Sequence, residues 1–172
     1  MRIAILGNSG SGKSTLAQWL ARRHGAPLLD LDSVAWEPGQ IAVRRAAEAA
    51  TREVRDFCEL HRTWVLEGCY ASLVEVALAF EPRLIFLNPG EAQCMENCRG
   101  RPWEPHKYPS KVEQDERLAF LLFWVADYYQ RDGEMSLSGH ATLFESYAGE
   151  KYELTARPEL DDAAREPPAW ST

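Results

Sequence analysis

Long hydrophobic runs are missing from this sequence of 172 residues. The longest strongly apolar run, residues 118–126, is far below the roughly 20 residues that a membrane-spanning helix needs. The short apolar run after Met1 is interrupted by glycines too soon to form a signal peptide. We therefore expect a cytoplasmic protein that does not contact a membrane.

Cysteine and positive charge are also scarce. The four cysteines, Cys58, Cys69, Cys94 and Cys98, are expected to be reduced thiols in a cytosolic chain. Cys94, Cys98 and His106 would need a fourth ligand to form a structural metal site, and the sequence offers none. The 26 acidic side chains outnumber the 19 basic ones, which gives a net charge of −7. Such a surface disfavours direct binding to nucleic acid or anionic lipid.

The sequence has no internal repeat, and short apolar runs alternate with amphipathic segments. This alternation predicts a single α/β domain over residues 1–155, with a parallel sheet and crossover helices. A segment with little periodicity, 156–172, is expected to be a flexible acidic, proline-rich tail. We expect strands at 2–6, 27–31, 63–66, 83–87 and 151–155, and helices at 13–24, 43–61, 72–80, 90–98, 111–130 and 138–147, the last capped by Ser138.

A glycine-rich segment links the first expected strand to the first expected helix. It satisfies the pattern G-x-x-x-x-G-K-[ST], and its residues are Gly7, Asn8, Ser9, Gly10, Ser11, Gly12, Lys13, Ser14 and Thr15. In this context, glycines let successive backbone N–H groups point at phosphate oxygens, and the helix directs its positive end to the same place. We expect Lys13 to reach the β- and γ-phosphates and the Ser14 hydroxyl to bind Mg²⁺. The sequence therefore predicts a P-loop for a nucleoside triphosphate with magnesium.

Acidic residues follow two of the expected strands. Asp30 and Asp32 end the second strand, where alternate residues would point the same way, and Glu67 with Gly68 ends the third. In an open α/β sheet these ends lie beside the phosphate site. We expect Asp32 to orient the acceptor or act as general base, and Glu67 to lie behind the magnesium ligands with Asp30 nearby. The alternative is that Asp30 and Asp32 cap the following turn.

Basic residues gather in residues 99–110, a segment too rich in proline to be regular. We expect a lid in which Arg99 and Arg101, with Lys107, close on the triphosphate and neutralise charge during the reaction. An ordinary solvated loop is the alternative. Two aromatic residues, Trp36 and Tyr70, follow the acidic motifs and could stack on the base or sugar of an acceptor, or simply pack in the protein.

Four stretches together, residues 7–15, 29–39, 64–70 and 84–88, resemble the bacterial P-loop proteins known as DNA topology modulation proteins, which are small kinases related to adenylate kinase by their fold. The resemblance covers about residues 1–155. It implies an ATP-dependent kinase core, an α/β sandwich of three layers around a five-stranded parallel sheet in the order 2-3-1-4-5.

The same resemblance implies that Asp30, Asp32, Glu67 and Gly68 face the acceptor, and that the lid arginines face ATP. Two positions depart from the family. Asn88 stands where an aspartate is usual after the fourth strand, and Glu67 stands where an aspartate is commoner, so its carboxylate is moved by about one bond length.

These patterns predict a magnesium-dependent kinase that transfers the γ-phosphoryl group of ATP to a small acceptor, with nucleosides and nucleotides ahead of other hydroxyl compounds. The alternative is a nucleotide-dependent switch that hydrolyses ATP slowly and acts through a partner. A kinase should have a closed acceptor pocket, whereas a switch should expose a large apolar face there. The sequence does not indicate the oligomeric state.

Overall fold

A computed structural model of the protein describes residues 1–37, 43–103, 109–156 and 158–160. Lys107, His106, the middle of the expected lid and residues 161–172 of the expected tail lie outside these residues. Within the described part of the chain, no helix is long and apolar enough to cross a membrane.

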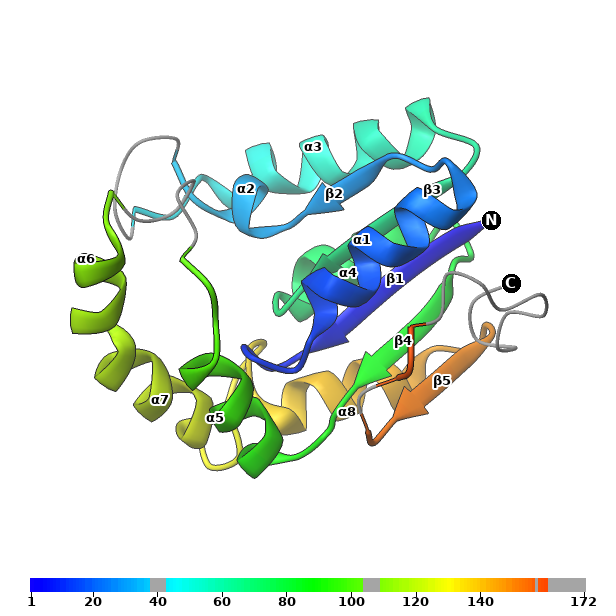
Figure 1. Ribbon diagram of the computed structural model, residues 1–172. Coiled ribbons are helices and arrows are strands. Elements are labelled where there is room, and N and C mark those ends of the chain that lie inside the picture. The colour runs from blue at the N-terminus through cyan, green and yellow to red at the C-terminus, as the bar shows by residue number, and fades with distance from the viewer. Residues whose placement is uncertain (38–42, 104–108, 157, 161–172) are drawn as a thin grey trace.

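The centre of the molecule is a sheet of five parallel strands (Figure 1). The strands are β1 (Arg2–Gly7), β2 (Leu28–Asp30), β3 (Trp64–Gly68), β4 (Arg83–Leu87) and β5 (Lys151–Leu154). They lie in the order β2-β3-β1-β4-β5, which confirms the order implied by the resemblance. Because β1, β3 and β4 are inner strands, both of their faces are buried, as their near-continuous apolar runs predicted.

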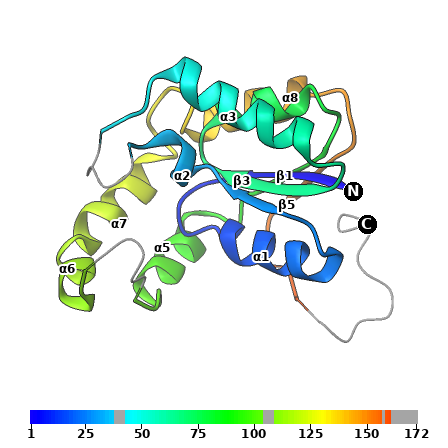
Figure 2. The same cartoon turned by 90° about the horizontal axis from the view of Figure 1, so that it is seen from above.

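Helices cover both faces of the sheet. On one face, Ile3 and Ile5 of β1 pack with α1 (Lys13–His24). On the other face, α3 (Ala47–Leu60), α4 (Ala71–Leu78) and α8 (Leu137–Ser146) cover the intervening residues of the same strand. Figure 2 shows these layers on opposite sides of the sheet. The fold is therefore the predicted three-layer sandwich.

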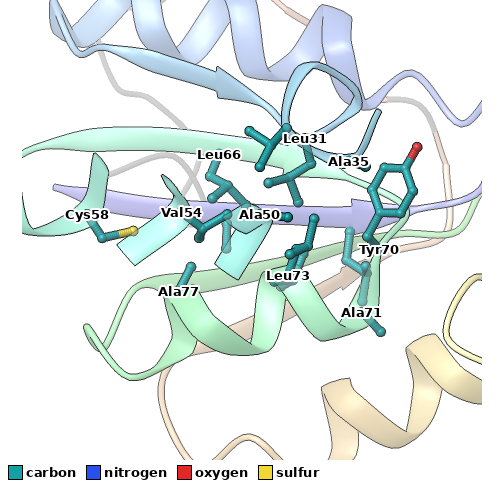
Figure 3. Close-up of a cluster of buried hydrophobic side chains, with 14 of the residues drawn as sticks. Leu31, Ala35, Ala50, Val54, Cys58, Leu66, Tyr70, Ala71, Leu73 and Ala77 are labelled. Atoms are coloured by element: carbon teal, nitrogen blue, oxygen red, sulfur yellow. The ribbon is translucent and has the colours of Figure 1, made fainter. Parts of the chain in front are cut away.

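The largest of the three hydrophobic core clusters lies beneath α3 and α4 (Figure 3). Val54 of α3 and Ala77 of α4 meet Leu66 of β3 there, and each side chain is completely buried. Burial of a side chain such as Val54 or Leu66 stabilises the fold by about 1.5–3 kcal/mol. On the α1 side, Leu160 packs against the second-largest cluster, so the first described part of the expected tail contacts the domain.

Three helices form an arm beyond the carboxyl ends of the strands (Figure 1). They are α5 (Glu91–Arg99), α6 (Lys111–Glu116) and α7 (Leu118–Asp127). The single helix expected at 111–130 is wrong, because the chain is interrupted at Arg117, whose ψ is −6°. The two halves have different partners: Gln114 of α6 donates to the Pro102 carbonyl, whereas α7 packs its leucines against α5.

Two helix starts also differ from the sequence prediction. The last helix is capped by Ser136 rather than Ser138, because the buried Ser136 hydroxyl accepts from the Gly139 N–H at 3.0 Å. The helix expected from residue 43 begins at Ala47. Arg44 instead forms an isolated antiparallel bridge with Trp36, and this pairing holds residues 43–46 out of the helix.

Candidate active site

The P-loop has a backbone that only glycine tolerates at two positions. Gly10 and Gly12 have φ of +76° and +98°, in the region that side chains with a Cβ rarely adopt. A Cβ on Gly10 would also lie 2.4 Å from the Cys94 carbonyl oxygen of α5. The loop leads into α1, whose first turn contains no acidic residue. The positive end of α1 is therefore open to an anion, which is the property that a triphosphate requires.

Lys13 lies inside this loop. Its side chain is buried and its ammonium donates to the Asn8 carbonyl oxygen at 3.0 Å. Lys13 therefore places a cation within the cradle, and the flexible stem allows the ammonium to exchange this carbonyl for a phosphate oxygen.

The arm of α5 and α7 holds the P-loop in place. The Asn8 side-chain amide donates to the Val125 carbonyl of α7 at 3.0 Å, and the Asn97 amide of α5 donates to the Gly10 carbonyl at 2.8 Å. Gln93 in turn donates to the Asn97 side-chain oxygen at 3.0 Å. The Asn8 and Asn97 hydrogen bonds thus connect the P-loop to α7 and to α5.

Glu67 is the next-to-last residue of β3 and borders the same cleft as the P-loop. It pairs in register with Ile5 of β1 and with Asp30 of β2, and its side chain is buried. Burial raises the pKa of Glu67, the Lys13 charge lowers it, and the Asp30 charge raises it again. The Ser14 side chain lies close enough to Glu67 to lower its pKa as well. The two residues predicted for magnesium are thus neighbours.

The donor set fits Mg²⁺ held mainly by phosphates. In the described residues, no group of three or more His, Cys, Asp or Glu side chains could hold a metal by itself. Mg²⁺ commonly uses one or two protein oxygens together with substrate phosphates and water. The Ser14 hydroxyl, with the Glu67 carboxylate behind it, matches that pattern.

Asp30 and Asp32 occupy different kinds of backbone, although alternate positions on one strand were expected. Asp30 ends β2, whereas Asp32 is the first residue of a short helix, α2 (Asp32–Ala35). The Asp30 carboxylate accepts from the Asp32 backbone N–H at 2.9 Å. Asp30 therefore caps the turn, which was the alternative reading for it, and this cap directs the chain so that Asp32 borders the cleft described below.

The aromatic residues predicted at the acceptor lie elsewhere. Only 3% of Tyr70 is exposed, so its ring is part of the core and is not available to stack on a ligand. Its hydroxyl donates to Asp32 Oδ1 at 2.8 Å, and the Trp36 indole N–H donates to the Tyr70 hydroxyl at 2.7 Å. Neither residue borders the cleft. Tyr70 therefore contacts Asp32 directly, and the Trp36 side chain contacts Tyr70.

Only one of the two lid arginines borders the cleft. Arg101 borders the cleft, whereas Arg99 is exposed and does not; both arginines border a small pocket with Lys111 of α6. Asn88 also stays outside the cleft, and its amide donates to Glu153 of β5 at 3.2 Å. Asn88 therefore joins the end of β4 to β5.

One cleft of about 890 Å³ joins the P-loop to the acidic strand ends. The residues that border it come from the P-loop and α1, from the ends of β2 and β3, and from α5 with the segment after it. They are Ser9, Gly10, Gly12, Lys13, Ser14, Thr15, Gln18, Asp32, Glu67, Gly68, Cys69, Gln93, Glu96, Asn97, Gly100, Arg101 and Pro102.

Four polar residues of the cleft were missed at the level of sequence: Gln18, Gln93, Glu96 and Asn97. The three on α5 follow the spacing i, i+3, i+4, so they share one helix face, while Cys94 and Cys98 are buried against α7. The polar face of α5, opposite its small apolar face, could have identified these three residues from the sequence.

All four cysteines are free thiols, and burial raises the pKa of Cys69 and of Cys94 to about 11.

The sequence matches one protein family, described as AAA domain, over residues 3–119. The chain belongs to the AAA domain family. The matched residues run from β1 into α7 and include the P-loop, Asp32 and Glu67. No curated protein matches the chain significantly. The narrower resemblance to the DNA topology modulation proteins stays a prediction.

Solved structures show the fold of this AAA domain. A sugar kinase from Janibacter sp. HTCC2649 is 13% identical, with a TM-score of 0.51, and the match covers 91% of this chain and 86% of that one. The YorR protein of Bacillus subtilis, solved with phosphorylated GDP, is 11% identical, with a TM-score of 0.52 and the same coverages, 91% and 86%. These likenesses, together with the strand order, make this a P-loop kinase fold.

Proposed function

We propose that this AAA domain is a magnesium-dependent kinase that transfers the γ-phosphoryl group of ATP to the hydroxyl group of a small acceptor. One observation carries the proposal. The Lys13 cradle and the Asp32 carboxylate, from different strand ends, border the same cleft. A nucleotide site alone would need the first of these groups, whereas a transfer site needs both.

Each residue has a chemical task in this proposal. Backbone N–H groups of the P-loop and the Lys13 ammonium bind the phosphates, and the Ser14 hydroxyl with Glu67 behind it would hold the metal. Bound Mg²⁺ would neutralise charge on the phosphate oxygens. Arg101, which borders the cleft, would stabilise the charge that develops on the transferred group. Arg99, the last residue of α5, does not border the cleft and has no task in this proposal.

The transfer step exchanges one oxygen–phosphorus bond for another. The acceptor oxygen forms a bond to the γ-phosphorus while the bond from that phosphorus to the β–γ bridging oxygen breaks. The hydroxyl proton of the acceptor passes to the Asp32 carboxylate, and ADP leaves with the electron pair of the broken bond. Asp32 must therefore be ionised at the start of each turnover.

The acceptor is small and polar in this proposal. Among the cleft residues that the structure describes, there is no aromatic side chain, and carboxylates and amides predominate. A hydrogen-bonding acceptor fits such a lining better than one held by stacking. Nucleosides and nucleotides, which were expected first, are therefore tested beside other hydroxyl compounds on equal terms.

A switch ATPase is the second candidate, because the arm exposes apolar side chains. Phe120 and Phe123 of α7 are 71% and 69% exposed, and Val112 of α6 is 66% exposed. None of these residues borders the cleft. They favour contact with a partner through the arm, whereas the acidic cleft favours transfer.

A screen for ADP release decides between the two candidates. The protein with Mg²⁺ and ATP is assayed with nucleosides, nucleotides and small hydroxyl metabolites, and ³¹P NMR identifies any phosphorylated product. We expect one class to raise ADP release well above the rate without acceptor. The variant Asp32→Asn should abolish that increase and keep ATP binding. If no compound raises ADP release and no product is detected, the kinase proposal is wrong.

A further inference from the structure

Trp36 and Tyr70 form a hydrogen-bonded chain that ends on Asp32. The Trp36 indole N–H lies 2.7 Å from the Tyr70 hydroxyl oxygen, which lies 2.8 Å from Asp32 Oδ1. Figure 3 shows the Tyr70 ring at the edge of the core cluster, with its hydroxyl turned away from the cluster. The carboxylate at the cleft is thus contacted from inside the protein.

The direction of both hydrogen bonds is fixed by chemistry. An indole N–H can only donate, so the Tyr70 oxygen accepts that bond. The single proton of the phenol must then point to Asp32, and the Asp32 oxygen receives it. A protonated Asp32 Oδ1 would place two protons between the same two oxygens. Burial raises the pKa of the Tyr70 phenol, so its proton is retained.

The outer end of the chain is fixed by Arg44. Its guanidinium lies 5.5 Å from the centre of the Trp36 ring and 5.7 Å from that of Tyr70, within the range of a cation–π contact. Glu134 binds the same guanidinium at 3.0 Å, and the Trp36–Arg44 bridge joins the two backbones. Because the ring of Trp36 is fixed on one face and at its nitrogen, the chain has little freedom to swing away from Asp32.

We propose that Trp36 and Tyr70 are positioning residues of the phosphoryl transfer. Their hydrogen bonds keep the Asp32 carboxylate ionised and hold it in the orientation in which it can take the acceptor proton. This inference rests on the proposed role of Asp32 as the base. Trp36 acts through Tyr70, and Tyr70 acts through Asp32, without contact to either substrate. The roles predicted from sequence, in which both rings touch the acceptor, are replaced by this one.

The test compares Tyr70→Phe, Trp36→Phe and the double variant. A hydrogen bond to a charged group is worth enough to move the acid limb of the kcat profile by about one pH unit. We expect Tyr70→Phe to move that limb to higher pH by this amount and to lower kcat about tenfold, with the KM for ATP unchanged. Trp36→Phe should give a smaller shift in the same direction. The double variant should equal Tyr70→Phe, because the hydrogen bond of the Trp36 indole ends on the Tyr70 hydroxyl and acts on Asp32 through it.

The matched control is Tyr147→Phe, which removes a hydroxyl that donates to the Pro82 carbonyl, away from the cleft. It should leave the pH profile unchanged. A purely structural role for Tyr70 would lower the thermal midpoint and leave the acid limb in place, and that result would overturn the proposal. So would a double variant whose shift is the sum of the two single shifts.

A readout without turnover separates this inference from the proposed function. The carboxyl ¹³C signal of Asp32 is titrated by NMR in the parent protein and in Tyr70→Phe. We expect its transition to move to higher pH in the variant. If no acceptor is ever phosphorylated but the transition moves, the kinase proposal fails and the effect of Tyr70 on Asp32 stands. If transfer occurs and the transition does not move, the inference fails alone.

Discussion

His140 gives the molecule a pH-dependent stability that can be calculated from its surroundings. The residue belongs to α8 and is completely buried. Its Nε2 lies 2.9 Å from the Cys69 carbonyl oxygen, and its Nδ1 lies 2.8 Å from the Tyr128 hydroxyl. Since a carbonyl only accepts, Nε2 carries the proton and Nδ1 accepts from Tyr128. The neutral ring is therefore fully paired. A second proton on Nδ1 would turn this nitrogen into a donor, and the Tyr128 hydroxyl proton would lose its acceptor.

Burial lowers the pKa of His140 from 6.5 to about 4. In the unfolded chain the imidazole binds a proton near pH 6.5, whereas in the folded chain it does so only near pH 4. Stability is therefore complete above pH 6.5 and is lost as the pH falls toward 4. At about 1.4 kcal/mol per pH unit, the loss amounts to about 3 kcal/mol. Such a loss is a large part of the stability of a typical domain.

Urea unfolding between pH 7.5 and 4.5, followed by tryptophan fluorescence, measures this loss. Glu67 acts in the opposite direction, because burial raises its pKa, so the parent curve alone is not sufficient. The variant His140→Gln removes only the imidazole contribution, and His24→Gln removes an exposed histidine as a control. We expect the stability difference between the parent and His140→Gln to shrink as the pH falls. An equal pH dependence in both proteins would refute the argument.

Three further predictions concern the cleft. Lys13→Ala should weaken ATP binding about a hundredfold, because it removes charge-assisted hydrogen bonds to the phosphates; unchanged affinity in calorimetry would remove Lys13 from the nucleotide site. Asp32→Asn should lower transfer by about 10²–10⁴-fold and change ATP affinity less than about twofold, as steady-state kinetics and calorimetry would report; equal turnover would exclude Asp32 as the base. Gly10→Ala should lower the unfolding free energy by more than about 2 kcal/mol and abolish ATP binding, since its Cβ would meet α5. Gly133→Ala, at a φ of +99° with open space around it, should cost about 1 kcal/mol and retain ATP binding, so equal losses in the two glycine variants would contradict the clash.

The parts of the site that could be predicted from sequence are those that depend on residues close together along the chain. The P-loop needs left-handed glycines and a lysine at fixed spacing, so Gly10, Gly12 and Lys13 are visible without a structure. Glu67 could be predicted as well, because it directly follows the apolar run Trp64–Leu66 near the end of a buried strand. The order of the strands came from the resemblance, since pairing between strands leaves no local signal.

What escaped prediction depends on contacts between distant segments. The Tyr70 position after β3 gives no sign of the Trp36 indole that meets it, and both rings were therefore placed at the acceptor. The break at Arg117 is similar, because the sequence from Lys111 to Gln130 is uniformly compatible with a helix. The partners that end it, on α5 and in the segment after it, are chosen by the tertiary structure.

The two asparagine braces on the P-loop make the arm and the nucleotide site one mechanical unit. The Asn8 side-chain amide donates to the Val125 carbonyl near the end of α7, and the Asn97 amide of α5 donates to the Gly10 carbonyl. Any rotation of the arm must carry the Asn8 side chain and the Gly10 carbonyl with it, or break these two hydrogen bonds. Linkage then works in both directions: a molecule that binds the exposed face of α7 and tilts the arm changes the affinity for ATP, and ATP changes the affinity for that molecule by the same factor. The affinity of the P-loop for ATP thus depends on the position of the arm.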